Sequence, residues 1–206
     1  MSQCRAIYDE ADFEAGALCD SDRPGTKTLH RGRGIVGEAK MAIECFLKIE
    51  GPDLTGEAQS IGHEGQIDVL SWSWGLSQSV SMHQAGGGGA GKASVRDLEV
   101  TKFVDAATPK LVLACLSGTQ FRSATLTCLR VGGDGARIPY VVIAMQRVIV
   151  RAVDDGGTSG DEPFTEDLSL NFAEVIVRYT KQNQDGSAGE EVAIGWSIRE
   201  NKRLPT

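Results

Sequence analysis

The sequence predicts a mainly β fold with one short helix. Apolar residues recur with a period of two in several segments, and glycine-rich turns separate those segments at regular intervals. Only one segment carries both a start signal and a stop signal for a helix, which limits the expected helical content. This spacing of strands and turns is typical of a closed barrel or a sandwich with one helix attached.

The expected strands lie between residues 42 and 202, and segments rich in glycine and polar residues separate them. The strands are 42–51, 66–79, 94–104, 121–131, 137–153, 164–182 and 192–202. The longer loops are 51–65, 154–163 and 184–191. Residue 139 is a proline near the start of its strand, where a strand tolerates proline.

The strand at 66–79 shows the clearest alternation. Its large apolar residues are Leu70, Trp72, Trp74 and Leu76. Its small residues are Ser71, Ser73, Gly75, Ser77 and Ser79. Because successive side chains of a strand point to opposite faces, we expect the first set to be buried. The second set then forms a small polar face without charge.

The helix is expected within 105–118. Thr108 is the predicted N-cap, Pro109 occupies the first helical position, and Gly118 is placed to end the helix. The helix is short, roughly ten residues. Its apolar set is Leu111, Leu113, Ala114 and Leu116.

Charge and hydropathy exclude several classes of protein. The chain of 206 residues has a net charge of −7, which argues against general binding to nucleic acids or anionic membranes. No apolar run approaches the roughly 20 residues that span a bilayer, so no membrane insertion is expected. The N-terminus lacks the pattern of a secretory signal. We therefore expect a protein that folds in the cytoplasm and leaves, if at all, without a cleavable signal peptide.

Residues 1–40 differ from the rest of the chain. They show no sustained period of 2 or 3.6, and strong patterning begins only after Met41. The sequence therefore predicts two parts. Residues 1–40 are a disordered N-terminal extension or the product of a mis-assigned start, and residues 41–206 form the β domain.

A glycine-rich segment, AGGGGAGKAS at 85–94, is close to the phosphate-binding loop G-x-x-x-x-G-K-[ST]. Gly86, Gly91 and Lys92 fit, but the hydroxyl position is occupied by Ala93. A functional loop must also follow a buried strand and open a helix, whereas the residues after Lys92 favour a strand. A flexible loop between two strands is therefore the favoured interpretation, and no cofactor is expected.

No catalytic or metal-binding constellation is evident. The five cysteines, Cys4, Cys19, Cys45, Cys115 and Cys128, are widely spaced, without a C-x-x-C pair. A disulfide framework or a zinc site is not expected, and Cys115 and Cys128 are predicted to be buried. Trp72 and Trp74 could stack on a sugar or base, but their apolar neighbours favour core packing, and the same holds for Trp196.

Four motifs, taken in order, carry a resemblance to a known family. IDVLSWSWGLSQSVSMHQAGGGGAGKAS (67–94) and DLEVTKFVDAATPKLVLACLSG (97–118) resemble the haemolysin-coregulated protein family, Hcp, the tube proteins of the bacterial type VI secretion system. LNFAEVIVRY (170–179) and GWSIREN (195–201) resemble the C-terminal signatures of that family. The likeness covers about Met41 to Asn201, and residues 1–40 have no counterpart in usual members.

The resemblance implies a compact β-barrel of two antiparallel sheets with one flanking helix. It also implies six copies in a ring with a central channel, stacked into the inner tube that a contractile sheath propels behind a spike protein. Effector proteins would be carried in the channel. Members lack enzymatic activity unless a toxin domain is fused, so no enzyme is expected.

Candidate contact residues follow from this resemblance and from the small polar face. Ser71, Ser73 and Ser77 are the candidates for contacts with effectors in the channel. The alternative is that this face packs against a neighbouring subunit. The loops 51–65 and 83–92 are candidates for ring or stacking contacts, and the named residues of the second loop are His83, Gly86, Gly88 and Lys92.

Two other functions stay open at this point. One is a small nucleotide hydrolase that uses the glycine loop up to Lys92. The other is a monomeric β-sandwich that binds a small ligand through Trp72 or Trp74.

Overall fold

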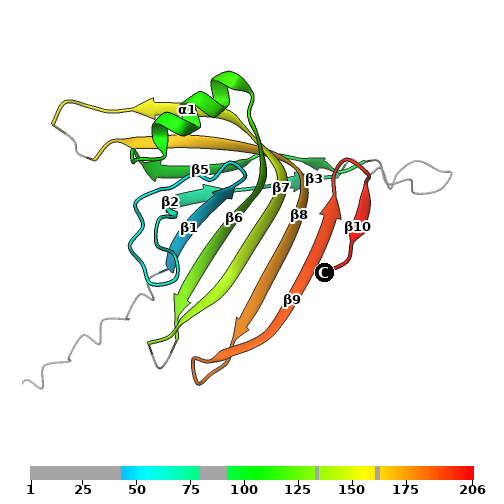
Figure 1. Cartoon of the computed structure of the whole chain (residues 1–206). Coiled ribbons are helices and arrows are strands. Elements are labelled where there is room, and N and C mark those ends of the chain that lie inside the picture. The colour runs from blue at the N-terminus through cyan, green and yellow to red at the C-terminus, as the bar shows by residue number, and fades with distance from the viewer. Residues whose placement is uncertain (1–42, 79–91, 133–134, 161–162) are drawn as a thin grey trace, which may run out of the picture. The chain divides into compact units, whose positions relative to one another are not determined.

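A computed structural model describes residues 43–78, 92–132, 135–160 and 163–206 (Figure 1). The tail expected at 1–40 lies outside these residues. The one helix of the described residues is α1 (Thr108–Ser117). The strands are β1 (Ile43–Glu50), β2 (Ile67–Ser73), β3 (Leu76–Ser77), β4 (Ser94–Val95), β5 (Leu98–Phe103), β6 (Gln120–Val131), β7 (Arg137–Gly156), β8 (Thr165–Gln182), β9 (Ala188–Ser197) and β10 (Lys202–Leu204). The mainly β class with one short helix is confirmed.

The main sheet has eight strands in the order β10-β9-β8-β5-β2-β1-β6-β7, and all its neighbours are antiparallel. A further pairing of β7 with β8 closes the sheet into a barrel. The first half of β8 pairs with β5, and its second half pairs with β9 on the same edge. The barrel therefore continues along β7, β8 and β9 into a long curved extension (Figure 1). The second sheet is the short pair β3-β4.

The core fills the barrel. Buried apolar residues from β1, β2, β5, β6, β7 and β8 form one cluster, which includes Leu47, Ile67, Leu98, Leu126, Met145 and Leu170. On β1 the alternation is simple, because Leu47 and Ile49 are buried while Lys48 between them is exposed. Side chains of the opposite parity face the outside of the barrel.

The loop at 51–65 packs on the outside of β1. Phe46 points outward and stacks on the ring of His63, with ring centroids 4.6 Å apart. Ala58 is buried against Phe46 and Leu129. Within the loop, the amides of Gly56 and Ala58 donate hydrogen bonds to the carbonyls of Gly65 and Gln66 at 2.8 and 3.0 Å. This loop therefore has a defined shape, although the sequence indicates only turn-forming residues.

The expected burial of Leu70 and Leu76 is wrong. Leu70 is 48% exposed and Leu76 is 58% exposed. For Leu70 the cause is a β-bulge, because Val69 pairs with Lys102 while Ser71 pairs with Thr101, which leaves Leu70 as an extra residue in β2. Leu76 is exposed because it lies beyond β2, in β3 of the separate β3-β4 pair. The bulge shifts the alternation by one residue, so the core residues before it are Ile67 and Val69.

The tryptophans pack as expected. Trp72, Trp74 and Trp196 are partly buried against the main core, which confirms the packing interpretation. Trp74 lies 6.0 Å from Phe172, measured between ring centroids, and its Nε1 donates to the carbonyl of Arg96 at 3.0 Å. The large ring thus joins the start of β5 to β8.

The helix lies against β7, at the top of Figure 1. Gly118 ends the helix as predicted and adopts the left-handed conformation with φ 66°. Pro109 is the second helical residue, one position later than predicted. Thr108 is not the N-cap, because Ala107 holds that position and makes no side-chain capping bond. Only Leu111 and Ala114 of the expected apolar set are buried. Leu113 and Leu116 are exposed, since the helix contacts the barrel with a narrow face.

The two cysteines that are predicted to be buried differ in their burial. Cys128 is buried in β6, as predicted. Cys115 is only partly buried, and its Sγ lies 3.6 Å from the carbonyl of Arg151.

Candidate functional site

Two of the three predicted channel serines are exposed on the same face of one strand. Ser71 and Ser73 are both exposed on β2, where they pair with Thr101 and Glu99 of β5. Residues directly opposite each other in antiparallel strands point to the same face of the sheet. The outer face of β2 therefore continues onto β5.

The same face extends to β8. Thr101 pairs with Asp167 and donates from Oγ1 to Oδ1 of Asp167 at 2.6 Å. Glu99 pairs with Ser169 and accepts at Oε1 from the Ser169 hydroxyl at 2.9 Å. Two cross-strand rows result, which we call the polar rows: Ser71–Thr101–Asp167 and Ser73–Glu99–Ser169. This face is acidic, whereas β2 alone predicted an uncharged surface.

Ser73 also borders a small hollow of about 170 Å³ at the end of the polar rows. The hollow is lined by Ser73, Trp74, Gly75, Arg96, Asp97 and Glu99. Asp97 is nearly buried, forms an ion pair with Arg151, and accepts at Oδ1 from Nδ2 of Asn171 at 2.6 Å. The Asp97 carboxylate raises the pKa of the exposed Arg151 guanidinium through this contact.

Ser77 lies apart from the polar rows. The chain leaves β2 at Trp74 and Gly75, and Ser77 belongs to β3, where it pairs with Ser94 of β4. Lys92 is exposed and lies two residues before β4. The residues after Lys92 form a strand, as predicted, and not the helix that a phosphate-binding loop requires. His83, Gly86 and Gly88 lie outside the described residues.

An apolar groove of about 440 Å³ runs between the β3-β4 pair and the curved extension of the barrel. It is lined by Trp74, Leu76, Ala93, Val95, Val175, Val177, Ile194, Gly195, Trp196 and Arg203. Ile194 and Val192 on β9 are both 58% exposed, and Leu76 is exposed at the groove as well. Clustered exposure of large apolar side chains is typical of a binding surface.

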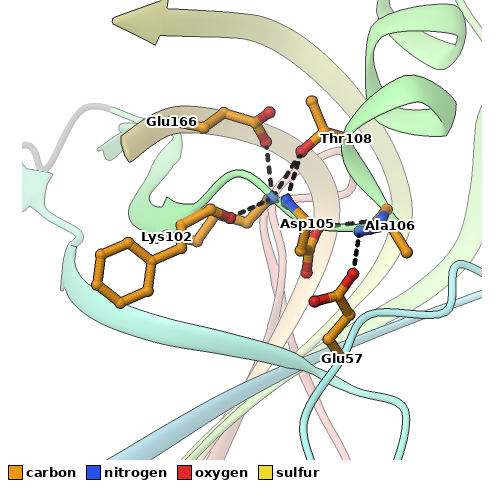
Figure 2. Close-up of polar contacts among 8 residues, drawn as sticks. Glu57, Lys102, Asp105, Ala106, Thr108 and Glu166 are labelled. Carbon is orange, nitrogen blue, oxygen red and sulfur yellow. Dashed lines mark hydrogen bonds and ion pairs between the residues drawn. The ribbon is translucent and has the colours of Figure 1, made fainter. Parts of the chain in front are cut away.

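A buried charged cluster joins α1 to the barrel (Figure 2). Nζ of Lys102 is fully buried and donates to the carbonyl of Phe103 at 2.9 Å, to Oδ1 of Asp105 at 2.8 Å and to Oγ1 of Thr108 at 3.0 Å. It also forms an ion pair with Oε1 of Glu166 at 3.1 Å. Burial raises the pKa of Glu166, while the neighbouring Lys102 opposes that rise.

The loop at 51–65 reaches the same cluster. Oε1 of Glu57 accepts from the amide of Ala106 at 3.1 Å, next to the start of α1 (Figure 2). Ile61, near the tip of this loop, is 87% exposed. The sequence analysis did not identify Lys102 as a buried cation. The signal that could have identified it is the alternation of β5, in which Lys102 is in phase with the buried residues Leu98 and Val100.

Comparison with known proteins gives one consistent result. The family model described as "Type VI secretion system effector, Hcp" matches residues 46–179. The chain is also 46% identical over 162 residues to protein Hcp1 of Pseudomonas aeruginosa, an alignment that covers 78% of this chain and 98% of that protein.

The chain belongs to the Hcp family.

Solved structures agree with this assignment. The structure of a type six secretion system protein matches with a TM-score of 0.73 and 29% identity, and it covers 79% of this chain and 100% of that chain. The crystal structure of Hcp1 from Salmonella typhimurium matches with a TM-score of 0.65 and 30% identity, covering 80% of this chain and 100% of that chain. The barrel fold that the resemblance implied is thereby confirmed.

Hcp is the tube protein of the type VI secretion system. The matched region of this Hcp chain contains the polar rows and the Lys102 cluster, and most of the groove lining. The helix of the described residues is not long and apolar enough to cross a membrane.

Proposed function

We propose that this chain forms hexameric rings, as Hcp proteins do, and that the rings stack head to tail into an inner tube. A contractile sheath surrounds the tube, a spike protein sits at its tip, and effector proteins travel in its channel to the outside of the cell. The chain acts as a structural subunit and a carrier, and not as an enzyme. The observation that carries this proposal is the identity of 46% to Hcp1 over 98% of that protein.

The surfaces support self-assembly. A ring of identical subunits needs a heterologous interface, in which two different patches of the protomer meet. The apolar groove and the exposed side chains of Val192 and Ile194 offer one such patch on β9. The polar rows offer a different kind of surface, small and hydrogen-bonded, which suits contact with water and with varied protein cargo.

Native mass spectrometry of the full chain tests the ring. We expect a species of six times the 22.0 kDa protomer at low micromolar concentration. A monomer over a wide concentration range contradicts the proposal. Ile194→Asp places a charge at the groove, so we expect it to lower the hexamer fraction. Ile61→Asp is the matched control, since it lies on the loop 51–65 and is expected to weaken stacking while the ring mass persists.

The role of the polar rows is tested with Ser73→Arg. If the rows face the channel, the hexamer mass persists and the retention of acidic or basic effectors changes with the added charge. If the rows pack against a neighbouring subunit, the bulky cation breaks the ring. Lys48→Met, on the exposed side of β1, is the control for a general effect of altered surface charge.

A further inference from the structure

Two cysteines that are far apart in the sequence face each other across neighbouring strands. β1 and β6 are antiparallel, and Cys45 is the direct partner of Cys128 in their register. Directly opposite residues share one face of the sheet, with Cα atoms roughly 4.5–5.5 Å apart. That separation lies inside the range of about 4.4–6.8 Å found for disulfides.

We propose that Cys45 and Cys128 are an oxidisable dithiol, which forms an intramolecular disulfide between β1 and β6 in an oxidising compartment. Both thiols are free in the structure. Cys128 belongs to the main core and the partly buried Cys45 packs against that core. The bond would join two strands of the barrel that only hydrogen bonds and packing hold otherwise.

The two thiols have different environments, which assigns their roles. Cys45 is partly buried, and its contact with the Cys128 thiol lowers the pKa of Cys45. Cys128 is only 3% exposed, and the same contact together with burial raises its pKa. An oxidant reaches the partly buried Cys45 more readily than the buried Cys128, so Cys45 is the attacking residue and Cys128 is the resolving residue.

The reaction is balanced with a small-molecule disulfide such as glutathione disulfide. The Cys45 thiolate attacks one sulfur of the oxidant, forms a mixed disulfide and releases one glutathione thiolate. Cys128 then loses its proton to water and attacks Sγ of Cys45, which releases the second glutathione thiolate. The two cysteines are oxidised to one disulfide, and one glutathione disulfide is reduced to two glutathione molecules.

Formation of the Cys45–Cys128 disulfide does not depend on the tube function. The transfer of the protein from a reducing to an oxidising compartment rests on the proposed export. Thiols stay reduced in a cytoplasm and oxidise outside it. The dithiol would therefore persist during folding and ring assembly. The disulfide would form after release, when the protein no longer has chaperones or a reducing pool around it.

Peptide mapping of the full chain tests the bond. The protein is incubated in glutathione buffers from reducing to oxidising, free thiols are alkylated, and trypsin digestion follows without reduction. Cleavage after lysine and arginine places Cys45 in peptide 41–48 and Cys128 in peptide 123–130. We expect a linked pair of these peptides, two hydrogen masses lighter than their sum, which a reductant separates.

Variants define the roles. Cys128→Ser is expected to trap glutathione on Cys45, while Cys115→Ser is the matched control and should leave the linked pair unchanged. The melting temperature of the wild-type chain, measured oxidised and reduced, needs no variant and should rise on oxidation by about 5 °C or more. Three results overturn the proposal: lasting glutathione on Cys45 in the wild type, no oxidation in the most oxidising buffer, or a link from Cys45 to any other cysteine.

Discussion

The buried cation Lys102 gives the most direct test of how the helix and barrel are held together. We consider Lys102→Met, which keeps a long unbranched side chain and removes only the charge and its hydrogen bonds. In the native protein Nζ contacts four oxygens, at 2.8, 2.9, 3.0 and 3.1 Å. Without it, the carboxylates of Asp105 and Glu166 remain at a buried site that has lost its cation.

The size of the effect follows from this arrangement. Removing one partner of a buried ion pair leaves an uncompensated charge, which costs about 3–5 kcal/mol. For a domain of this size, each kcal/mol shifts the melting temperature by about 2–4 °C, so we expect a fall of roughly 6–20 °C. Glu166→Gln should cost less, because Lys102 keeps Asp105 as its partner.

Urea unfolding at a fixed protomer concentration is the assay, since assembly stabilises the folded state by mass action. Lys110→Met, an exposed lysine of α1, is the matched control and should change the free energy of unfolding by less than about 0.5 kcal/mol. The double variant Lys102→Met/Glu166→Gln should recover part of the loss. If Lys102→Met costs no more than the control, the cluster does not stabilise the barrel and the reasoning is wrong.

The pH dependence has a defined sign. Burial raises the folded-state pKa of Glu166 above its ordinary value of 4.5, so the folded protein binds more protons than the unfolded chain between these two values. The contribution of Glu166 to stability is therefore greatest below pH 4.5 and is lost as the pH rises through the folded pKa. The Lys102→Met penalty should shrink as the pH falls, because protonation neutralises the carboxylate that lost its cation.

Three further predictions concern packing and backbone contacts, and each is measured as a change in the free energy of unfolding. Leu111→Ala removes a fully buried side chain between α1 and the barrel and should cost about 2–5 kcal/mol, whereas Leu116→Ala on the exposed side of α1 should stay within about 0.5 kcal/mol. Gly56→Ala should cost about 1–3 kcal/mol, because a Cβ there collides with the backbone carbonyl of Gln66. Asp97→Ala should cost about 1–3 kcal/mol, because it leaves the amide and guanidinium that bind it without their acceptor.

The fold class could be predicted from the sequence because period and turn chemistry are local properties. The β segments and Gly118 as the end of the helix follow from such local signals, and the structure confirms them. The predicted strands 66–79 and 94–104 are each divided, because β3 and β4 leave the main sheet and pair with each other. The bulge at Leu70 could not be predicted, since it exists only in the pairing of β2 with β5. The prediction that Leu76 is buried was wrong for a related reason. The chain leaves β2 before Leu76 and enters the separate β3-β4 pair.

In the candidate site, too, local features could be predicted and features that depend on strand pairing could not. The exposed serines of β2 were visible as an alternating pattern, but the acidic partners Glu99 and Asp167 come from strands elsewhere in the chain. Cross-strand neighbours depend on register, which one sequence does not reveal. The buried charge of Lys102 was missed for the opposite reason. Its inward position is visible in the pattern of 98–103, yet a lysine there is normally assigned to solvent.

One register connects these two sides of the sheet. In the pairing of β5 with β8, Lys102 stands opposite Glu166, which is the inward ion pair. The next positions, Thr101 opposite Asp167, form the hydrogen bond of the outward polar row. A slip of β8 by one residue would turn Glu166 outward, away from Lys102, and place Asp167 in the core. The buried ion pair therefore favours the register that builds the polar rows, and this links a residue inside the barrel to the surface chemistry on its outside.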